Sequence, residues 1–418
     1  MNKKTSLQKF SFYILIVTLP LFVFTVLFFT RQTNAGYSIS SVKHVNPFQD
    51  RFIKQVDTLI NNTFTRQNTP GAAVVIVKDT TIIYMHGLGL KDNVNTKTIF
   101  RLGSVSKGIT AMLSSLLVAD SLFGWDDTLS TYIPDFKISP KSESDSITIR
   151  HILSHSSGLP YHTYTNLIED GKSLDEILPY LKNVHLIARP GERYSYQNVI
   201  FSLIANVIKK QAGKDFSTVL TERLFIPLGM NRASATYEAI TADSNVALPH
   251  RQIDSIWTAT TISKKYYNAA PAGGINASIS DMSHYLRALL GGYPKIINED
   301  QLNQLFKPRV NTAIEWRYRR IWKGLKDMHY ALGWRTMEFE KDTLIYHGGY
   351  VNSYRSAVAF DKKNKWGICV LSNAPSGFVP KVMSGFWDLY QTHSRSIDSW
   401  DDYIRKMISS ENNVLMKD

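Results

Sequence analysis

Ser104 and Lys107 lie three positions apart, and a serine and a lysine at this spacing could do chemistry together. On a helix, the spacing places both side chains on one face. A lysine amine held in apolar surroundings can lose its proton and then activate a serine hydroxyl as a nucleophile. The same spacing also occurs at Ser6 and Lys9, so it does not identify a catalytic pair by itself. Ser104 is therefore either an activated nucleophile or the cap of a helix.

The residues before Ser104 favour the catalytic interpretation. Residues 98–103 are typical of an extended segment that turns at Gly103 directly into a helix beginning close to Ser104. Such a turn directs the serine hydroxyl and its backbone N–H out of the helix N-terminus, where negative charge is stabilised. An acyl-transfer nucleophile needs this geometry.

A second candidate pair, Tyr196 and Asn198, stands just ahead of residues 199–211, which we expect to be helical. A tyrosine can pass a proton, and an asparagine can present its amide to a substrate carbonyl or hydroxyl. The alternative is a tyrosine that packs at a helix start beside an asparagine cap.

A third candidate group, His347, Gly348, Gly349 and Tyr350, follows a strand-like run near the C-terminal end. The two glycines remove side chains where a substrate backbone could lie against an edge strand. The Tyr350 N–H could then serve as the second donor of an oxyanion hole. Alternatively, His347 is a strand-end histidine beside a bulge.

In this order and with these flanks, the three groups resemble the serine β-lactamase and penicillin-binding-protein superfamily, specifically its class C-like branch. That branch includes class C β-lactamases, D-alanyl-D-alanine carboxypeptidases, D-aminopeptidases and bacterial esterases. The resemblance runs from about Phe48 to Thr392. Further segments carry it: residues 70–74, 100–103, 149–160, 270–274 and 330–334.

The resemblance implies a role for each of the matching residues. Ser104 would be the acylated nucleophile, and Lys107 the amine that activates it. Tyr196 would relay a proton to the leaving group, while Asn198 would bind the substrate amide. The backbone N–H groups of Ser104 and Tyr350 would form the oxyanion hole.

The third group departs from the class C pattern, because His347-Gly348-Gly349 stands where class C β-lactamases usually have Lys-Thr-Gly. A histidine is mostly neutral at pH 7, so it offers a β-lactam carboxylate less than a permanent cation does. We therefore expect a preference for uncharged esters or amides, and a shift towards carboxylate-bearing substrates when lower pH charges the imidazole. A second departure is Ser353, where family members often carry glycine.

The elements that must position these residues predict an α+β fold: an antiparallel sheet flanked by helices, with an inserted helical subdomain. The hydrolase domain is expected over 47–393, with its α/β part at 47–147 and 255–393 and the helical insert at 148–254. The other expected elements are a helix over 47–64, a hairpin at 72–77 and 81–84, strands at 330–334, 343–346, 356–360 and 367–371, and a last helix over 380–392.

The N-terminal 35 residues are expected to be an export signal or membrane anchor. Residues 11–30 contain no charge and follow three lysines, which predicts a segment that crosses the cytoplasmic membrane with its N-terminus inside. We slightly favour a retained anchor over cleavage before Gly36. A linker at 36–46 and a tail at 394–418 complete the chain, and the domain would lie in the periplasm or on the outer face of the membrane.

Composition excludes several classes of protein. The single cysteine, Cys369, excludes an internal disulfide and a cysteine-rich zinc module. Part of the net charge of +13 belongs to the N-terminal segment, and no Lys/Arg tract is long enough to bind nucleic acid. His151 and His155 have the spacing of zinc ligands, but Ile152 replaces the glutamate of that motif, so no metal or other cofactor is expected.

These observations together predict an exported serine hydrolase that acts on an ester, a D-amino-acid peptide or a β-lactam. A class C β-lactamase proper, a D-Ala-D-Ala carboxypeptidase, and a catalytically silent cell-wall binding protein on the same fold are the alternatives. The substrate would be a small molecule or peptidoglycan-like. The basic aromatic segment 316–323 either binds an anionic polymer or a membrane, or is a solvated loop.

Overall fold

The computed structural model describes residues 47–89, 94–314 and 316–393. The predicted membrane segment 11–30, the linker 36–46 and the tail 394–418 lie outside these residues. Within the described ranges, no helix combines the length and the apolar character needed to cross a bilayer.

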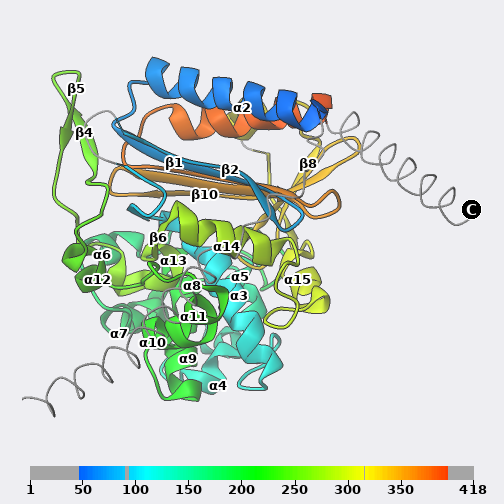
Figure 1. The fold of residues 1–418 in the computed structure, drawn as a ribbon. Coiled ribbons are helices and arrows are strands. Elements are labelled where there is room, and N and C mark those ends of the chain that lie inside the picture. The colour runs from blue at the N-terminus through cyan, green and yellow to red at the C-terminus, as the bar shows by residue number, and fades with distance from the viewer. Residues whose placement is uncertain (1–46, 90–93, 315, 394–418) are drawn as a thin grey trace, which may run out of the picture. The chain divides into compact units, whose positions relative to one another are not determined.

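An eight-stranded antiparallel sheet forms the centre of the fold, as the α+β prediction required (Figure 1). Its strand order is β2-β1-β12-β11-β10-β9-β8-β7. The strands are β1 (Gly71–Lys78), β2 (Thr81–Gly89), β7 (Val310–Asn311), β8 (Asp327–Tyr330), β9 (Arg335–Glu338), β10 (Thr343–Val351), β11 (Tyr354–Asp361) and β12 (Trp366–Ser372). The first hairpin and the last three strands thus meet in one sheet, because β1 pairs with β12.

Two helices cover one face of this sheet: residues 51–66 of α2 (Pro47–Arg66) and a helix at residues 378–393 (Figure 1). The predicted apolar stripe of α2 is buried there, at Phe52, Val56, Ile60 and Phe64. Each such side chain contributes roughly 1.5–3 kcal/mol through its burial. Side chains of a strand point alternately to opposite faces of the sheet. Those that point towards these two helices form a hydrophobic core with them.

The other face carries α14 (Ile279–Leu289), α3 (Ser106–Ala119) and the helical region beneath them (Figure 1). The remaining helices there are α4 (Leu129–Tyr132), α5 (Ile149–Leu153), α6 (Thr165–Glu169), α7 (Leu174–Ile177), α8 (Asn198–Ser202), α9 (Ile204–Ala212), α10 (Phe216–Leu220), α11 (Ile226–Leu228), α12 (Tyr237–Ala242), α13 (Ala270–Gly273) and α15 (Glu299–Phe306). Helix α16 (Trp316–Ile321) instead contributes Tyr318 and Ile321 to the core on the α2 side of the sheet. Two small sheets pair β3 (Ile99–Arg101) with β6 (Asn276–Ser278), and β4 (His250–Ile253) with β5 (Ile256–Ala259). The predicted boundary between residues 254 and 255 falls in the turn of the β4–β5 hairpin.

The expected strand at residues 330–334 is wrong for all but its first residue. Tyr330 ends β8, and the next four residues form a tight turn in which the Ala331 N–H donates to the Trp334 carbonyl at 2.8 Å. Gly333 has φ +72° in this turn, and a Cβ there would lie 2.5 Å from the Lys107 carbonyl oxygen. The apolar run therefore folds back because a glycine must pass close to α3, and β9 begins directly afterwards at Arg335.

Candidate active site

Ser104 lies in a short 3₁₀ turn, Gly103–Val105, that connects β3 to α3. The structure shows no side-chain cap at this helix start, so the capping alternative does not describe Ser104. Gly103 adopts φ +51°, and a Cβ on it would lie 2.8 Å from the Tyr350 nitrogen. The glycine therefore lets the turn approach β10, and Ser104 lines a cavity of about 430 Å³.

The Lys107 amine is fully buried beside Ser104. Its Nζ lies 2.9 Å from Asn198 Oδ1, 2.8 Å from the Ala272 carbonyl oxygen and 3.3 Å from Ser104 Oγ. Burial, and then the positive charge of Arg335, holds the pKa of Lys107 well below its usual value. A neutral amine has two N–H groups, which the two shorter contacts use, and its lone pair is then left for the serine. Lys107 is thus arranged to accept the Ser104 proton.

Tyr196 approaches Ser104 from the helical region, and its hydroxyl donates to Ser104 Oγ at 2.8 Å. Burial raises the pKa of Tyr196, so the phenol keeps its proton at neutral pH. His155 holds the ring in place, with ring centroids 4.2 Å apart, and its Nδ1 accepts from the Gln197 N–H at 3.2 Å. Tyr196 is therefore a proton donor next to Ser104.

Asn198 is the first residue of α8 and is buried beside Lys107. Its Oδ1 accepts from the lysine amine, and it lines the same cavity as Ser104. In the described part of the chain, the side-chain hydrogen bond of Asn198 is the one made through Oδ1. The amide N–H groups are available to a substrate carbonyl.

Strand β10 offers backbone N–H groups to the cavity because its neighbour β9 covers only part of its length. A two-residue turn joins β10 to β11, so the flanking pair Val351 and Tyr354 is hydrogen-bonded, and the next pair, which contains Tyr350, is not. The Tyr350 N–H therefore points away from β11, towards the side where β9 begins only at Arg335. It is open to the cavity, as an oxyanion hole shared with the Ser104 N–H requires.

The turn that closes this hairpin sets the backbone conformation that Ser353 must adopt. Asn352 and Ser353 have φ of 42° and 74°, and these left-handed values are the ones that a tight two-residue hairpin turn demands. Glycine adopts them without strain, whereas a serine pays a conformational cost there.

His347 reaches the cavity, but its imidazole is engaged within the protein. Its Nε2 lies 2.9 Å from the Tyr330 hydroxyl, and its Nδ1 lies 2.8 Å from the Gly348 carbonyl oxygen. A carbonyl can only accept, so Nδ1 carries the proton and Nε2 accepts from Tyr330. Burial and the charge of Arg335 hold the pKa of His347 well below its usual value. In this geometry neither ring nitrogen is available to a substrate carboxylate.

The two glycines after His347 have different neighbours. A Cβ on Gly349 would lie 2.1 Å from the Leu102 carbonyl oxygen and 2.2 Å from Ser356 Oγ. A Cβ on Gly348 would meet only the hydroxyl end of Tyr346, at 2.5 Å. Both glycines line the cavity. At Gly349 a larger residue would collide with the backbone that leads to Ser104.

Arg335 is a residue of this cavity that the sequence analysis missed. It is 6% exposed, it is the first residue of β9, and its guanidinium donates to the Tyr194 hydroxyl at 3.0 Å. The only signal in the sequence is a single arginine directly after the segment 330–334. Nothing in its spacing connects it to the three groups of candidate residues.

The basic aromatic segment 316–323 contains helix α16, which forms one wall of the cavity. Tyr318 and Ile321 line the cavity, while Trp322 is buried beneath them. Arg319 and Arg320 are exposed. The segment is therefore neither wholly a solvated loop nor a detached basic patch, because Tyr318 and Ile321 belong to the cavity wall.

His151 and His155, which are spaced like zinc ligands in the sequence, each have a structural role. His151 closes a capping box at the start of α5, where the Thr148 N–H donates to its Nδ1 at 3.2 Å. His155 packs on Tyr196 as described above. Over the described ranges, no group of three or more His, Cys, Asp or Glu side chains could hold a metal ion.

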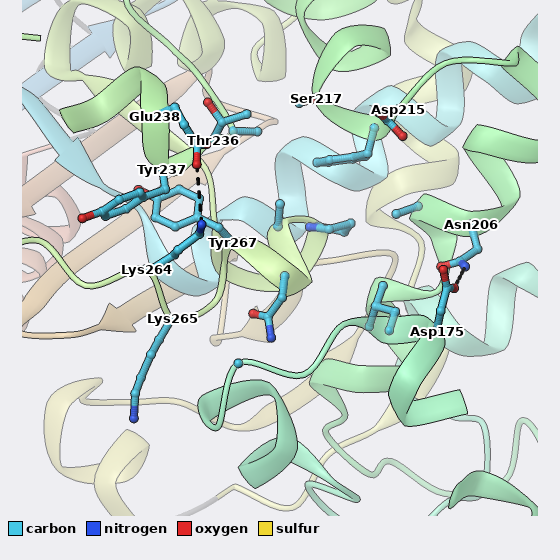
Figure 2. A pocket seen from close by; sticks show the side chains of 18 of the residues that line it. Asp175, Asn206, Asp215, Ser217, Thr236, Tyr237, Glu238, Lys264, Lys265 and Tyr267 are labelled. Atoms are coloured by element: carbon cyan, nitrogen blue, oxygen red, sulfur yellow. Dashed lines mark hydrogen bonds and ion pairs between the residues drawn. The ribbon is translucent and has the colours of Figure 1, made fainter. Parts of the chain in front are cut away.

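Figure 2 shows a second, larger cavity of about 800 Å³. Ala270 and Pro271 line this second cavity, whereas Ala272 and Gly273 line the cavity of Ser104. Its polar groups largely pair with one another: Lys264 lies 3.8 Å from Glu238, and Asn206 donates to Asp175 at 2.8 Å (Figure 2). None of the candidate catalytic residues lines it.

Comparison with known proteins places this geometry in a family. The chain is 23% identical over 359 residues to "Protein flp" of Staphylococcus aureus (strain NCTC 8325 / PS 47), covering 82% of this chain and 67% of that protein. It is 26% identical over 317 residues to "Unguisins hydrolase ungD'" of Aspergillus campestris (strain IBT 28561), covering 72% and 58%. The fold resembles that of the octameric penicillin-binding protein homologue from Pyrococcus abyssi, with a TM-score of 0.69, 22% identity, and coverage of 81% of this chain and 77% of that one. The family model for Beta-lactamase matches residues 50–385, so the chain belongs to the Beta-lactamase family.

Proposed function

We propose that the protein is a serine hydrolase that forms an acyl-enzyme on Ser104. The observation that carries this proposal is the position of Ser104 Oγ, 3.3 Å from the Lys107 amine and 2.8 Å from the Tyr196 hydroxyl. One neighbour can take the serine proton and the other can give a proton to a leaving group. The family match and the relative named as a hydrolase support a hydrolytic reaction.

The proposed reaction has two halves. Ser104 Oγ attacks the substrate carbonyl carbon while its proton passes to Lys107 Nζ, and the N–H groups of Ser104 and Tyr350 hold the oxyanion. The bond to the leaving group breaks as Tyr196 donates its proton to the departing atom, and the Lys107 ammonium then restores that proton to the tyrosine. Water next attacks the acyl carbon and passes a proton to the same pair. The pair returns this proton to Ser104 Oγ as its bond to the acyl carbon breaks, which releases the carboxylic acid and free Ser104.

The substrate is an ester, a D-amino-acid peptide or a β-lactam, since each presents a carbonyl with a protonatable leaving atom. Asn198 and strand β10 both line the cavity, and in this proposal they hold the chain on either side of that carbonyl. No metal or organic cofactor takes part in these steps.

We also propose that the domain works outside the cytoplasm, exported by residues 11–30 and acting on a small-molecule or peptidoglycan-like substrate. A reporter fused after Asp418 should be active only if it is of a type that works outside the cytoplasm. A reporter active only in the cytoplasm would overturn the proposal of export. N-terminal sequencing that starts at Gly36 would instead exclude a retained anchor.

The test of the proposed function is mass spectrometry of the purified protein after reaction with a fluorescent penicillin and, separately, with a 4-nitrophenyl ester. We expect an acyl adduct on the peptide that contains Ser104, and decay of the adduct with release of the acid. The Ser104→Ala protein is the control. Labelling that is equal in this variant would overturn the proposal, and binding without any adduct would support a silent binding protein.

A further inference from the structure

His155 is a buried titratable residue that the proposed reaction does not use. It follows Ser154, the C-cap of α5, and has φ +56°. Helices commonly end in this left-handed conformation, and glycine is the usual residue there because a Cβ makes the conformation unfavourable. His155 is nevertheless 0% exposed, so its side chain is held inside the protein. A histidine kept at such a position indicates that the imidazole itself has a task.

His155 holds the backbone on both sides of Tyr196. Its carbonyl oxygen accepts from the Ser195 N–H at 2.8 Å, and its Nδ1 accepts from the Gln197 N–H at 3.2 Å. The residues before and after Tyr196 are thus both bonded to the same histidine. The backbone of the proton donor therefore cannot move relative to the end of α5 without breaking one of these bonds.

The imidazole ring also contacts the Tyr196 side chain. The two ring centroids lie 4.2 Å apart at an interplanar angle of 44°. The imidazole packs in turn against Tyr330, at 4.7 Å, and against Phe201, at 5.3 Å. Both of these rings are buried, and the Tyr330 hydroxyl is bonded to His347. The phenol of Tyr196 therefore packs against a fixed wall, and its hydroxyl lies 2.8 Å from Ser104 Oγ.

His155 is not placed to act as an acid or base itself. Because Nδ1 accepts a hydrogen bond, the proton of the neutral ring is on Nε2, which is buried and meets no acceptor among the described residues. Burial first, and then the charges of Lys107 and Arg335, hold the pKa of His155 well below its usual value. The ring is therefore neutral and keeps Nδ1 as an acceptor. Histidine alone among the side chains combines an uncharged aromatic ring with such an acceptor.

We propose that His155 is a positioning residue that acts through Tyr196: its ring and its Nδ1 together hold the phenol where it can protonate the leaving atom. The inference rests on the proposed function, in which the Tyr196 proton passes to the departing atom as the bond to the acyl carbon breaks. A displaced donor loses much of this effect, because proton transfer needs hydrogen-bond geometry. His155 should thus affect mainly those substrates whose leaving group needs a proton.

Three acetate esters test the inference in the purified full-length protein: 4-nitrophenyl, phenyl and ethyl acetate. They form the same acyl-enzyme, and kcat/KM for each ester reports the formation of that acyl-enzyme. 4-Nitrophenolate is a stable anion that leaves without a proton, whereas ethoxide must be protonated as it leaves, and phenolate lies between them. In Tyr196→Phe we therefore expect the ratio of kcat/KM for ethyl acetate to that for 4-nitrophenyl acetate to fall by about a hundredfold or more.

Two variants separate the two contacts of His155. His155→Asn keeps an acceptor near the position of Nδ1 and removes the ring, while His155→Phe keeps a ring and removes the acceptor. In each variant the ester ratio should fall by about tenfold or more, because either loss lets the phenol move. In a Tyr196→Phe background neither change should lower the ratio further, because His155 acts through that tyrosine.

His151→Asn is the matched control. His151 is a histidine of α5 whose Nδ1 also accepts from a backbone N–H, that of Thr148 at 3.2 Å, and it does not line the cavity. The control should lower the free energy of unfolding without changing the ester ratio, and a merely structural role of His155 would give the same result. If His155→Phe does not fold, His155→Asn decides the question, since asparagine adopts the left-handed conformation readily.

An unchanged ester ratio in both His155 variants would overturn the inference, and so would a fall that persists in the Tyr196→Phe background. A fall in one variant alone would assign the positioning to the contact that this variant lacks. A failure of the proposed function gives a different result, because the wild-type protein then forms no acyl adduct with any of the three esters. That result would remove the inference together with the proposed function, whereas an unchanged ratio in an active enzyme removes the inference alone.

Discussion

The Lys107 amine lies 2.9 Å from the side-chain oxygen of Asn198, so the group proposed as the general base is held by a neutral amide. An amide oxygen accepts a hydrogen bond from the amine without adding a negative charge. The pKa of Lys107 therefore stays well below its usual value, as burial dictates.

A carboxylate at this position should reverse that effect. In Asn198→Asp a negative charge beside Nζ raises the pKa of Lys107, so the amine is protonated and cannot act as a base at neutral pH. We expect the acidic limb of the pH profile of kcat/KM to move to higher pH, with a large loss at pH 7 that is partly recovered at pH 9. Asn198→Ala should lower kcat/KM without this shift. An acidic limb at the same pH in wild type and Asn198→Asp would exclude Lys107 as the titrating group.

Ser104 and Lys107 should behave as one catalytic unit. Ser104→Ala and Lys107→Ala should each lower kcat by about a thousandfold or more, and the double variant should lose little beyond either single one, because both act in the same step. The exposed Lys210 of α9 provides a control, since Lys210→Ala should keep full activity. Steady-state kinetics with the best substrate found gives the measurement. A tenth or more of wild-type activity in Ser104→Ala would contradict the assignment.

His347 should not titrate in the range where the enzyme works. Burial first, and then Arg335, holds its pKa well below the ordinary 6.5, so the imidazole stays neutral as the pH falls from 8 to 6. We expect the ratio of kcat/KM for 3-acetoxybenzoate to that for phenyl acetate to remain constant over this range. His347→Gln, which has no titrating group, should give the same flat profile. A ratio that rises towards pH 6 in the wild type alone would show that His347 gains a proton there.

The sequence predicted the local parts of the site better than its long-range parts. Ser104 and Lys107 share a helix start, and Tyr196 and Asn198 share another, so short spacings were enough to group each pair. The antiparallel sheet and its flanking helices also followed from periodicity and are confirmed. Arg335 could not be found in this way, because its place depends on the register between β9 and β10.

The prediction of a strand at residues 330–334 was wrong for the same reason, because a contact with a distant part of the chain decides the local structure. The apolar side chains of this segment fit a strand, but Gly333 passes so close to the Lys107 backbone that the chain must turn there. The same turn brings Tyr330 to the imidazole of His347, a contact between residues 17 positions apart. No local sequence pattern indicates either of these contacts, and the contact between Tyr330 and His347 changes what the imidazole can bind.

Gly349 gives a stability test of how β10 supports the nucleophile. An alanine Cβ there would lie 2.1 Å from the Leu102 carbonyl oxygen, a backbone atom two residues before Ser104, so either the sheet or the Ser104 turn must move. We expect Gly349→Ala to lower the free energy of unfolding by about 2 kcal/mol or more, as overpacking against backbone does. Activity should fall with it, because the turn carries Ser104 and the backbone N–H proposed as one donor of the oxyanion hole.

Gly348→Ala is the matched control for this prediction. Its Cβ would meet the hydroxyl end of the Tyr346 side chain instead of backbone, so relief requires only a side-chain movement. The two variants add the same methyl group to adjacent residues of one strand, and neither position has a left-handed φ. Urea unfolding of both proteins gives the comparison. Equal loss of stability in the two variants would show that the approach of Leu102 to Gly349 does not constrain the fold, and the role of β10 in holding the Ser104 turn would have to be abandoned.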